Sequence, residues 1–190
     1  FRPVDIKPAP DGSLYVADFY EAKIAHLGHN DGVIDRATGR VYRLAATDAR
    51  FKKPVDLSKR TSKELVGLLS STNRWERETV LRLLGDRKDR SAIPLLLEQL
   101  QNTRGPSALA YLWGLNLSGG FNAGVAEGLL QHPEPQIRLW TIRLLADDHQ
   151  LGARLAPKLA ELARTEKSVH ARSQYAASAK RLSAGEGLPD

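Results

Sequence analysis

The feature that most constrains this chain is a pattern that recurs at the length of a helix hairpin. The segment RETVLRLLGD, which begins at Arg77, matches RLWTIRLLAD, which begins at Arg138, at the arginine, the paired leucines and the aspartate. A third copy, ALAYLWGLN from Ala108, lies between these two, and a fourth, RSQYAASAK from Arg172, follows them. Successive copies therefore start 31, 30 and 34 residues apart. Such a period indicates a stack of similar helix hairpins.

A second recurring segment supplies the first helix of each unit. AIPLLLEQL begins at Ala92 and LAPKLAEL begins at Leu155, and each carries a proline in its first turn and a glutamate four residues later. Proline is tolerated there because the N–H that it lacks has no partner within the helix. We therefore predict about four helix hairpins over residues 61–182, with apolar faces that shield one another by stacking.

Helix-start signals set the boundaries of this helical part. Glu64 follows Thr61 by three residues, and Glu76 follows Asn73 in the same way, which is the spacing of a capping box. The resulting division is a β-sheet segment over residues 1–46, a linker over 47–60, the helical repeats over 61–182 and a disordered tail over 183–190.

The first part of the chain predicts strands. Asp11-Gly12 is a tight-hairpin dipeptide, and Leu14 and Val16 alternate with Tyr15 and Ala17 as on a pleated sheet. A small antiparallel sheet, of the size of one propeller blade, follows from this pattern. The strand candidates are Val4–Lys7, Leu14–Tyr20, Lys23–Leu27 and Arg40–Leu44.

Such a sheet leaves its faces uncovered unless something packs against it. We expect it to dock on the first predicted helix, residues 61–70. The candidates for the apolar contact between the two parts are Phe1, Phe19, Phe51 and Trp75.

Composition excludes several kinds of structural feature and leaves nucleic-acid binding open as an alternative function. The 190 residues include no cysteine, which rules out disulfides and thiolate metal sites, and no apolar run is long enough to span a membrane. The formal net charge of +6 suggests a basic module that grips nucleic acid. Its arginine stripe would be interrupted by Ala108 and Trp113 in the second repeat. The members of that stripe are Arg77, Arg82, Arg138, Arg143 and Arg172.

No catalytic constellation can be assembled from these residues, and we expect no catalytic, cofactor-binding or metal-binding residue in this chain. His26 and His29 lie close to Asp31 and Asp35, but the glycine and asparagine between them favour an exposed loop over a metal site. The second helices carry the candidate interaction surface, although packing between repeats explains the tryptophans equally well. The candidate residues are Arg77, Trp113, Arg138, Trp140 and Arg172.

Two resemblances extend this interpretation. The helical part resembles the HEAT family of α-solenoid repeats, through the early proline of the first helix and the step Ile137-Arg138 that opens the second. PDGSLYVADFY followed by GRVYRL resembles the final blade of a β-propeller related to the glucose/sorbosone dehydrogenases. Their combination is similar to large bacterial proteins described as membrane-bound dehydrogenases.

These resemblances imply a context for the chain. The parent protein would be periplasmic or exported and would oxidise a sugar or alcohol with a quinone and haem c, none of which is held by these residues. The chain itself would be a non-catalytic spacer and protein-interaction module. Its partners would be the upstream propeller and a protein bound on the solenoid surface, with nucleic acid as the alternative.

Overall fold

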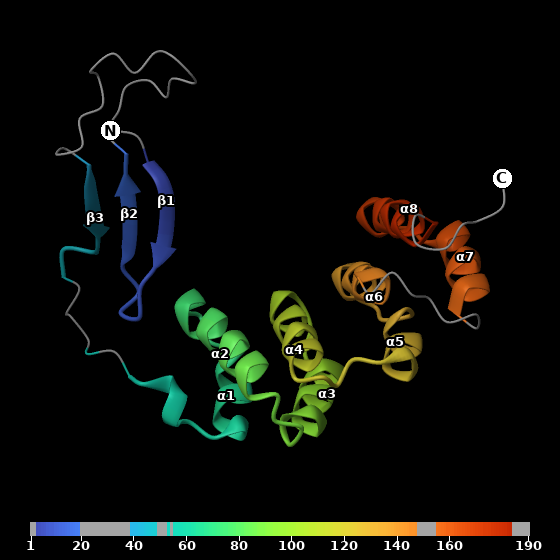
Figure 1. The fold of residues 1–190 in the computed structure, drawn as a ribbon, viewed down its shortest axis with the longest axis horizontal. Coiled ribbons are helices and arrows are strands. Elements are labelled where there is room, and N and C mark those ends of the chain that lie inside the picture. Colours follow the sequence, from blue (N-terminus) through green and yellow to red (C-terminus); the bar gives the residue numbers. More distant parts are fainter. Residues whose placement is uncertain (1–2, 20–38, 49–52, 54, 148–154, 184–190) are drawn as a thin grey trace, which may run out of the picture.

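The computed structural model describes residues 3–19, 39–48, 53, 55–147 and 155–183 (Figure 1). It confirms a mainly helical chain that begins with a small antiparallel sheet. The strands are β1 (Pro3–Pro8), β2 (Leu14–Asp18) and β3 (Arg40–Leu44), and a short 3-10 helix covers Leu57–Lys59. The helices are α1 (Ser62–Leu68), α2 (Arg74–Arg87), α3 (Ala92–Asn102), α4 (Pro106–Leu117), α5 (Ala123–Leu129), α6 (Pro135–Asp147), α7 (Leu155–Thr165) and α8 (Val169–Ser183).

The helices pair into successive hairpins that form a curved stack. Figure 1 shows α2, α4, α6 and α8 along the inner side of the curve and α1, α3, α5 and α7 along its outer side. The sheet lies at the end of the stack where the helices begin. We refer below to the side of the stack formed by the second helices as the inner face.

A shared apolar core joins the first hairpins. Leu69, Leu84 and Leu96, from three different helical segments, are fully buried within it. They converge on Gly114 of α4, where an added Cβ would lie 3.0 Å from Leu96, 3.3 Å from Leu69 and 3.4 Å from Leu84. Glycine at this point therefore allows α4 to approach the first hairpin closely.

The core continues along the stack. Leu129 and Ile137 of the third hairpin belong to the same buried cluster as the first two hairpins. A second cluster, which includes Ile142 of α6 and Tyr175 of α8, joins the third hairpin to the fourth. The mutual shielding expected of stacked hairpins is thus present at each junction.

The sheet has the order β1-β2-β3, with both pairs antiparallel. The predicted strands over Val4–Lys7 and Arg40–Leu44 are confirmed, and the predicted strand from Leu14 ends at Asp18, two residues early. Lys23–Leu27 lies outside the described residues. Arg43 of β3 donates from Nη2 to the carboxylate of Asp11 in the β1–β2 turn at 2.6 Å, and hydrogen bonds from Ser13 and Arg43 lower the pKa of Asp11 to about 2.

A polar contact joins the sheet to the helices in the described part of the chain. The amide nitrogen of Asn73 donates to the backbone oxygen of Pro10 in the β1–β2 turn at 2.9 Å, so the turn docks at the start of α2. Phe19 is 49% exposed, while Trp75 packs against the helical core. Phe1 and Phe51 lie outside the described residues. Among the described residues, the hairpin turn thus makes a direct contact with the stack through Asn73.

Asn73 also caps α2, because its side-chain oxygen accepts from the backbone N–H of Trp75 at 2.9 Å. Asn122 caps α5 in a similar way through Val125, at 3.1 Å. We expect Asn73→Ala and Asn122→Ala each to lower the free energy of unfolding in urea by about 1 kcal/mol through loss of a cap. Only Asn73→Ala should also make the amides of β1 and β2 exchange hydrogen about fivefold faster, because one anchoring hydrogen bond is lost. Equal exchange in both variants would show that Asn73 does not anchor the sheet.

Candidate interaction surface

The two tryptophans of the candidate surface meet on the inner face. The rings of Trp113 on α4 and Trp140 on α6 pack edge to face, with centroids 5.0 Å apart and an interplanar angle of 80°. Arg143, one turn beyond Trp140, places its guanidinium carbon 4.8 Å from the centre of the Trp140 ring. The three residues therefore form an aromatic–cation cluster across two neighbouring repeats.

This cluster contributes to packing and also reaches the surface. Both tryptophans are half-buried, whereas Arg143 is exposed. Trp140 packs against the apolar core that joins the hairpins. The indole N–H of Trp113 is buried and has no hydrogen-bond partner among the described residues. The tryptophans therefore contribute to the packing between repeats, and part of each stays at the surface.

The three arginines of the candidate surface donate hydrogen bonds to the loops that join the two helices of a hairpin. Arg77 donates from Nη1 to the backbone oxygen of Ser71 at 2.6 Å, and Arg138 donates to that of His132 at 2.7 Å. Arg172 donates to that of Glu166 at 3.0 Å. Because each acceptor lies six residues before its arginine, the recurrence of arginine reflects a repeated loop contact. The structure does not bring these side chains together with the tryptophans.

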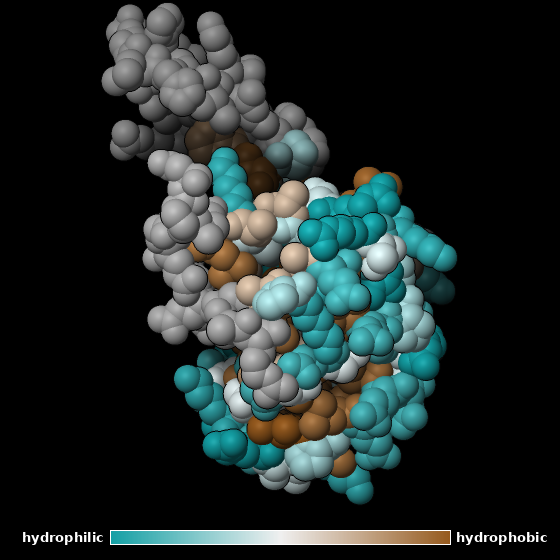
Figure 2. All heavy atoms as spheres, turned by 90° about the vertical axis from the view of Figure 1, so that its right-hand side faces the viewer, coloured by the Kyte–Doolittle hydropathy of each residue, from teal (hydrophilic) through white to brown (hydrophobic). Residues whose placement is uncertain are grey.

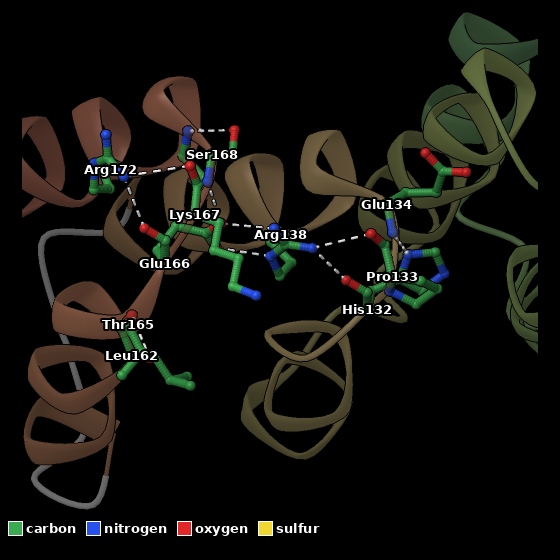
Figure 3. A network of polar contacts seen from close by, with 11 residues as sticks. His132, Pro133, Glu134, Arg138, Leu162, Thr165, Glu166, Lys167, Ser168 and Arg172 are labelled. Atoms are coloured by element: carbon green, nitrogen blue, oxygen red, sulfur yellow. Dashed lines mark hydrogen bonds and ion pairs between the residues drawn. The ribbon is translucent and has the colours of Figure 1, made fainter.

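Arg138 also joins the third hairpin to the fourth (Figure 3). Its Nη2 and Nε donate to the two carboxylate oxygens of Glu166 at 2.6 and 2.7 Å. The two side chains are only 17% and 5% exposed. These hydrogen bonds, with one from the backbone of Ser168, hold the pKa of Glu166 down to about 2 although burial opposes the charge. The pair is therefore a strong, desolvated clamp.

A groove of about 290 Å³ lies beside this clamp. His132 lines it, and its Nδ1 accepts from the backbone N–H of Glu134 at 3.1 Å, which leaves the proton of the neutral ring on Nε2. That Nε2 is buried without a partner in the described part of the chain. Burial, followed by the nearby charges of Arg104 and Arg138, lowers the pKa of His132. Burial therefore favours the neutral form of the His132 ring beside the Arg138–Glu166 clamp.

The charged groups around His132 are engaged with neighbouring polar groups. Glu134 accepts from the backbone N–H of Gly105 in the preceding hairpin at 3.1 Å, and the donors of Arg138 are shared between Glu166 and loop oxygens. Within residues 3–19, 39–48, 53, 55–147 and 155–183, no three histidines, aspartates or glutamates are placed to hold a metal ion. His26, His29, Asp31 and Asp35 lie outside those ranges. The hydrogen bonds of Glu134 and Arg138 thus hold neighbouring hairpins together.

Sequence reasoning omitted two residues from the candidate surface. Arg143 occupies the same repeat position as Trp113, thirty residues later, so the repeat offset itself was a usable signal. Glu166 offered no such signal, because the equivalent position holds Ser71 in the first hairpin and His132 in the third. Its role depends on the packing of one hairpin on the next.

The two ends of the stack differ in surface character. Figure 2 looks onto the end formed by the last helices and shows a mainly hydrophilic face, with hydrophobic side chains gathered in its lower part. At the other end, the sheet exposes large apolar side chains on its strands. No helix in the described part of the chain has both the length and the apolar character that a membrane crossing requires.

Comparison with known proteins gives one match. A family model described as a domain of unknown function, DUF7133, matches residues 1–48. This range includes the three strands and ends before the first helix. Nothing matches among curated proteins or among solved structures.

The Arg138–Glu166 clamp predicts a defined pH dependence of stability. Folding lowers the pKa of Glu166 from 4.5 to about 2, so its contribution is complete above the unfolded pKa and is lost as the pH falls from there towards 2. We expect Glu166→Gln to lower the free energy of unfolding in urea by roughly 2 kcal/mol at pH 7 and by progressively less below pH 5.

The matched control is Glu127→Gln, which removes the partner of Lys158 in a half-exposed pair 3.9 Å apart. A pair of this kind contributes less than about 1 kcal/mol. Equal losses in the two variants at pH 7, or a loss in Glu166→Gln that does not change with pH, would contradict the role of the clamp.

Proposed function

We propose that this chain is a non-catalytic spacer and protein-interaction module of a larger exported protein, in which a β-propeller precedes HEAT-like repeats. The sheet would be the terminal blade of the propeller, and the stacked hairpins would hold partners at a fixed distance from it. The observation that carries this proposal is the set of exposed apolar side chains on one face of the sheet.

That face holds three cross-strand rows, of which two are apolar and the third aligns Asp18 of β2 with Arg40 of β3. Ile6 of β1, Val16 of β2 and Tyr42 of β3 are aligned in one row, and Leu14 is aligned with Leu44 in the next. Val16 is buried between its neighbours, whereas Ile6 and Leu44 are each 57% exposed. Adjacent apolar side chains on a sheet face favour a covering layer. Another β-sheet is the cover that a propeller provides.

The opposite face of the sheet is mixed in character. Its rows align Lys7 with Tyr15 and Arg43, and Asp5 with Ala17 and Val41. A face that interleaves charged and apolar side chains is compatible with water. The contrast between the two faces supports assignment of the Ile6–Tyr42 and Leu14–Leu44 rows as the docking side.

The helical part suits a spacer role because its polar contacts hold the stack together. The Arg138–Glu166 clamp and the bond between Glu134 and Gly105 both join one hairpin to the next. The parent protein, on this proposal, oxidises a sugar or alcohol with quinone and haem groups held outside these residues. Turnover by this chain alone in dye-linked sugar oxidation would contradict the non-catalytic assignment.

The docking proposal is tested by two acidic substitutions on the same strand. Leu44→Glu alters the apolar face, and Val41→Glu, at a side chain that is 69% exposed, alters the opposite face. In the isolated chain we expect Leu44→Glu to reduce binding of a hydrophobic fluorescent dye by about half or more, with little change in Val41→Glu. In a longer protein that includes the upstream residues, Leu44→Glu should lower the melting temperature by several degrees, because a charge would be buried. Equal effects of the two substitutions would contradict a single docking face.

A further inference from the structure

A row of equivalent side chains crosses the inner face of the stack. Arg82 on α2, Trp113 on α4 and Arg143 on α6 occupy the same position in successive repeats, at offsets of 31 and 30 residues. Because α2, α4 and α6 lie side by side along the inner side of the curve (Figure 1), the row places a tryptophan between two arginines. Trp140 packs against this central tryptophan from α6.

The charges of the helices are divided unevenly between the two sides of the stack. The inner helices carry nine basic residues against four acidic ones, and the outer helices carry three against four. The inner side therefore favours an acidic partner over a neutral or basic one. The inner residues are Arg74, Arg77, Arg82, Arg87, Arg138, Arg143, Arg172, Lys180 and Arg181 against Glu76, Glu78, Asp86 and Asp147, and the outer ones are Lys63, Lys158 and Arg164 against Glu64, Glu98, Glu127 and Glu161.

The two arginines of the row are available to a partner. Arg143 is exposed, stacks on Trp140 and forms no ion pair with any described residue. Arg82 is 67% exposed, and its pair with Asp86 is a surface contact of 3.4 Å. Exposed pairs of this kind contribute little and exchange readily with an incoming carboxylate.

The spacing of the row limits the shape of the partner. Packed helices lie roughly 8–10 Å apart, so the axes of α2 and α6, with α4 between them, lie roughly 16–20 Å apart. Arg82 and Arg143 occupy equivalent positions on these two helices. An extended chain advances roughly 3.3 Å per residue, so this distance corresponds to about five or six residues. Six is a multiple of both two and three, so side chains six residues apart point the same way in a strand and in a polyproline II helix.

We infer that the inner face binds an extended acidic peptide segment whose two carboxylates lie six residues apart. One carboxylate pairs with Arg82 and the other with Arg143, while apolar or proline residues between them pack on Trp113 and Trp140. This inference rests on the proposed function, since it names the class of partner that the interaction module takes.

A peptide fits this surface better than a nucleic acid backbone does. A phosphate chain needs closely spaced cations, whereas α4 carries no charged residue and interrupts the row with Trp113. Arg77, Arg138 and Arg172 donate to loop oxygens at the starts of their helices. The arrangement of a cation, an aromatic pair and a second cation therefore matches sparse carboxylates with apolar residues between them.

The test is a calorimetric titration of the whole chain at low salt with two peptides of identical composition. The first is acetyl-Asp-Pro-Ala-Pro-Ala-Pro-Asp-amide, and the second is the isomer acetyl-Asp-Asp-Pro-Ala-Pro-Ala-Pro-amide. We expect the first peptide to bind at least about fivefold more tightly, because only its carboxylates span the two arginines. Its affinity should also fall as salt is added, because the contacts are exposed ion pairs.

Three variants assign the binding to the row. The double variant Arg82→Glu with Arg143→Glu should weaken binding of the first peptide by about tenfold or more, and the double variant with glutamine at both positions should weaken it less. Arg164→Glu, an exposed arginine on the outer helix α7, is the matched control and should bind as the unaltered chain does. Circular dichroism establishes that each variant remains folded.

Equal affinity for the two peptides, or equal weakening by Arg164→Glu, would overturn the inference. Tighter binding of a short DNA duplex than of the first peptide, lost in the same double variants, would also overturn it and would assign the face to nucleic acid. Leu44→Glu, on the sheet, should leave peptide binding unchanged. Failure of the peptide test with retention of the Leu44→Glu effect would therefore reject this inference and leave the docking role of the sheet intact.

Discussion

The structure depends on apolar contact between one helix hairpin and the next. At Gly114 the backbone of α4 comes so close to Leu69, Leu84 and Leu96 that a side chain would need a neighbour to move. No single hairpin of this length can bury its own apolar face, so each junction supplies what the hairpin lacks. The order of the hairpins, their curvature and the placement of the inner face all follow from this contact.

Polar side chains add hydrogen bonds within and between the hairpins, and these bonds determine which arginines stay exposed to solvent. The arginine that opens a second helix turns back to the preceding loop, as Arg77 and Arg172 do, and Arg138 also clamps Glu166 of the next hairpin. These arginines are therefore used for structure. Arg143 lies further along its helix and stacks on Trp140, so it reaches the inner face. Position within the repeat therefore separates the arginines that bind loop oxygens from Arg143, which stays exposed.

The sequence predicted features that depend on local chemistry, and it missed those that depend on packing. The repeat, the sheet and the capping box of Thr61 with Glu64 were all predictable, because each is a pattern that can be read along the sequence. At Asn73 the same pattern was only half right, since Glu76 binds the hydroxyl of Ser71 instead of the cap backbone. The docking of the sheet through Asn73 and the meeting of Trp113 with a neighbouring repeat require the folded chain.

Stacking completes the apolar core of the helices, whereas the sheet keeps exposed apolar side chains. Native-state hydrogen exchange of the isolated chain measures this directly, because it gives a free energy of opening for each element. We expect the amides of β1, β2 and β3 to open with a free energy at least about 2 kcal/mol lower than that of amides in the middle of α2 and α4. Sheet amides that exchange with the same free energy as those helices would contradict this expectation.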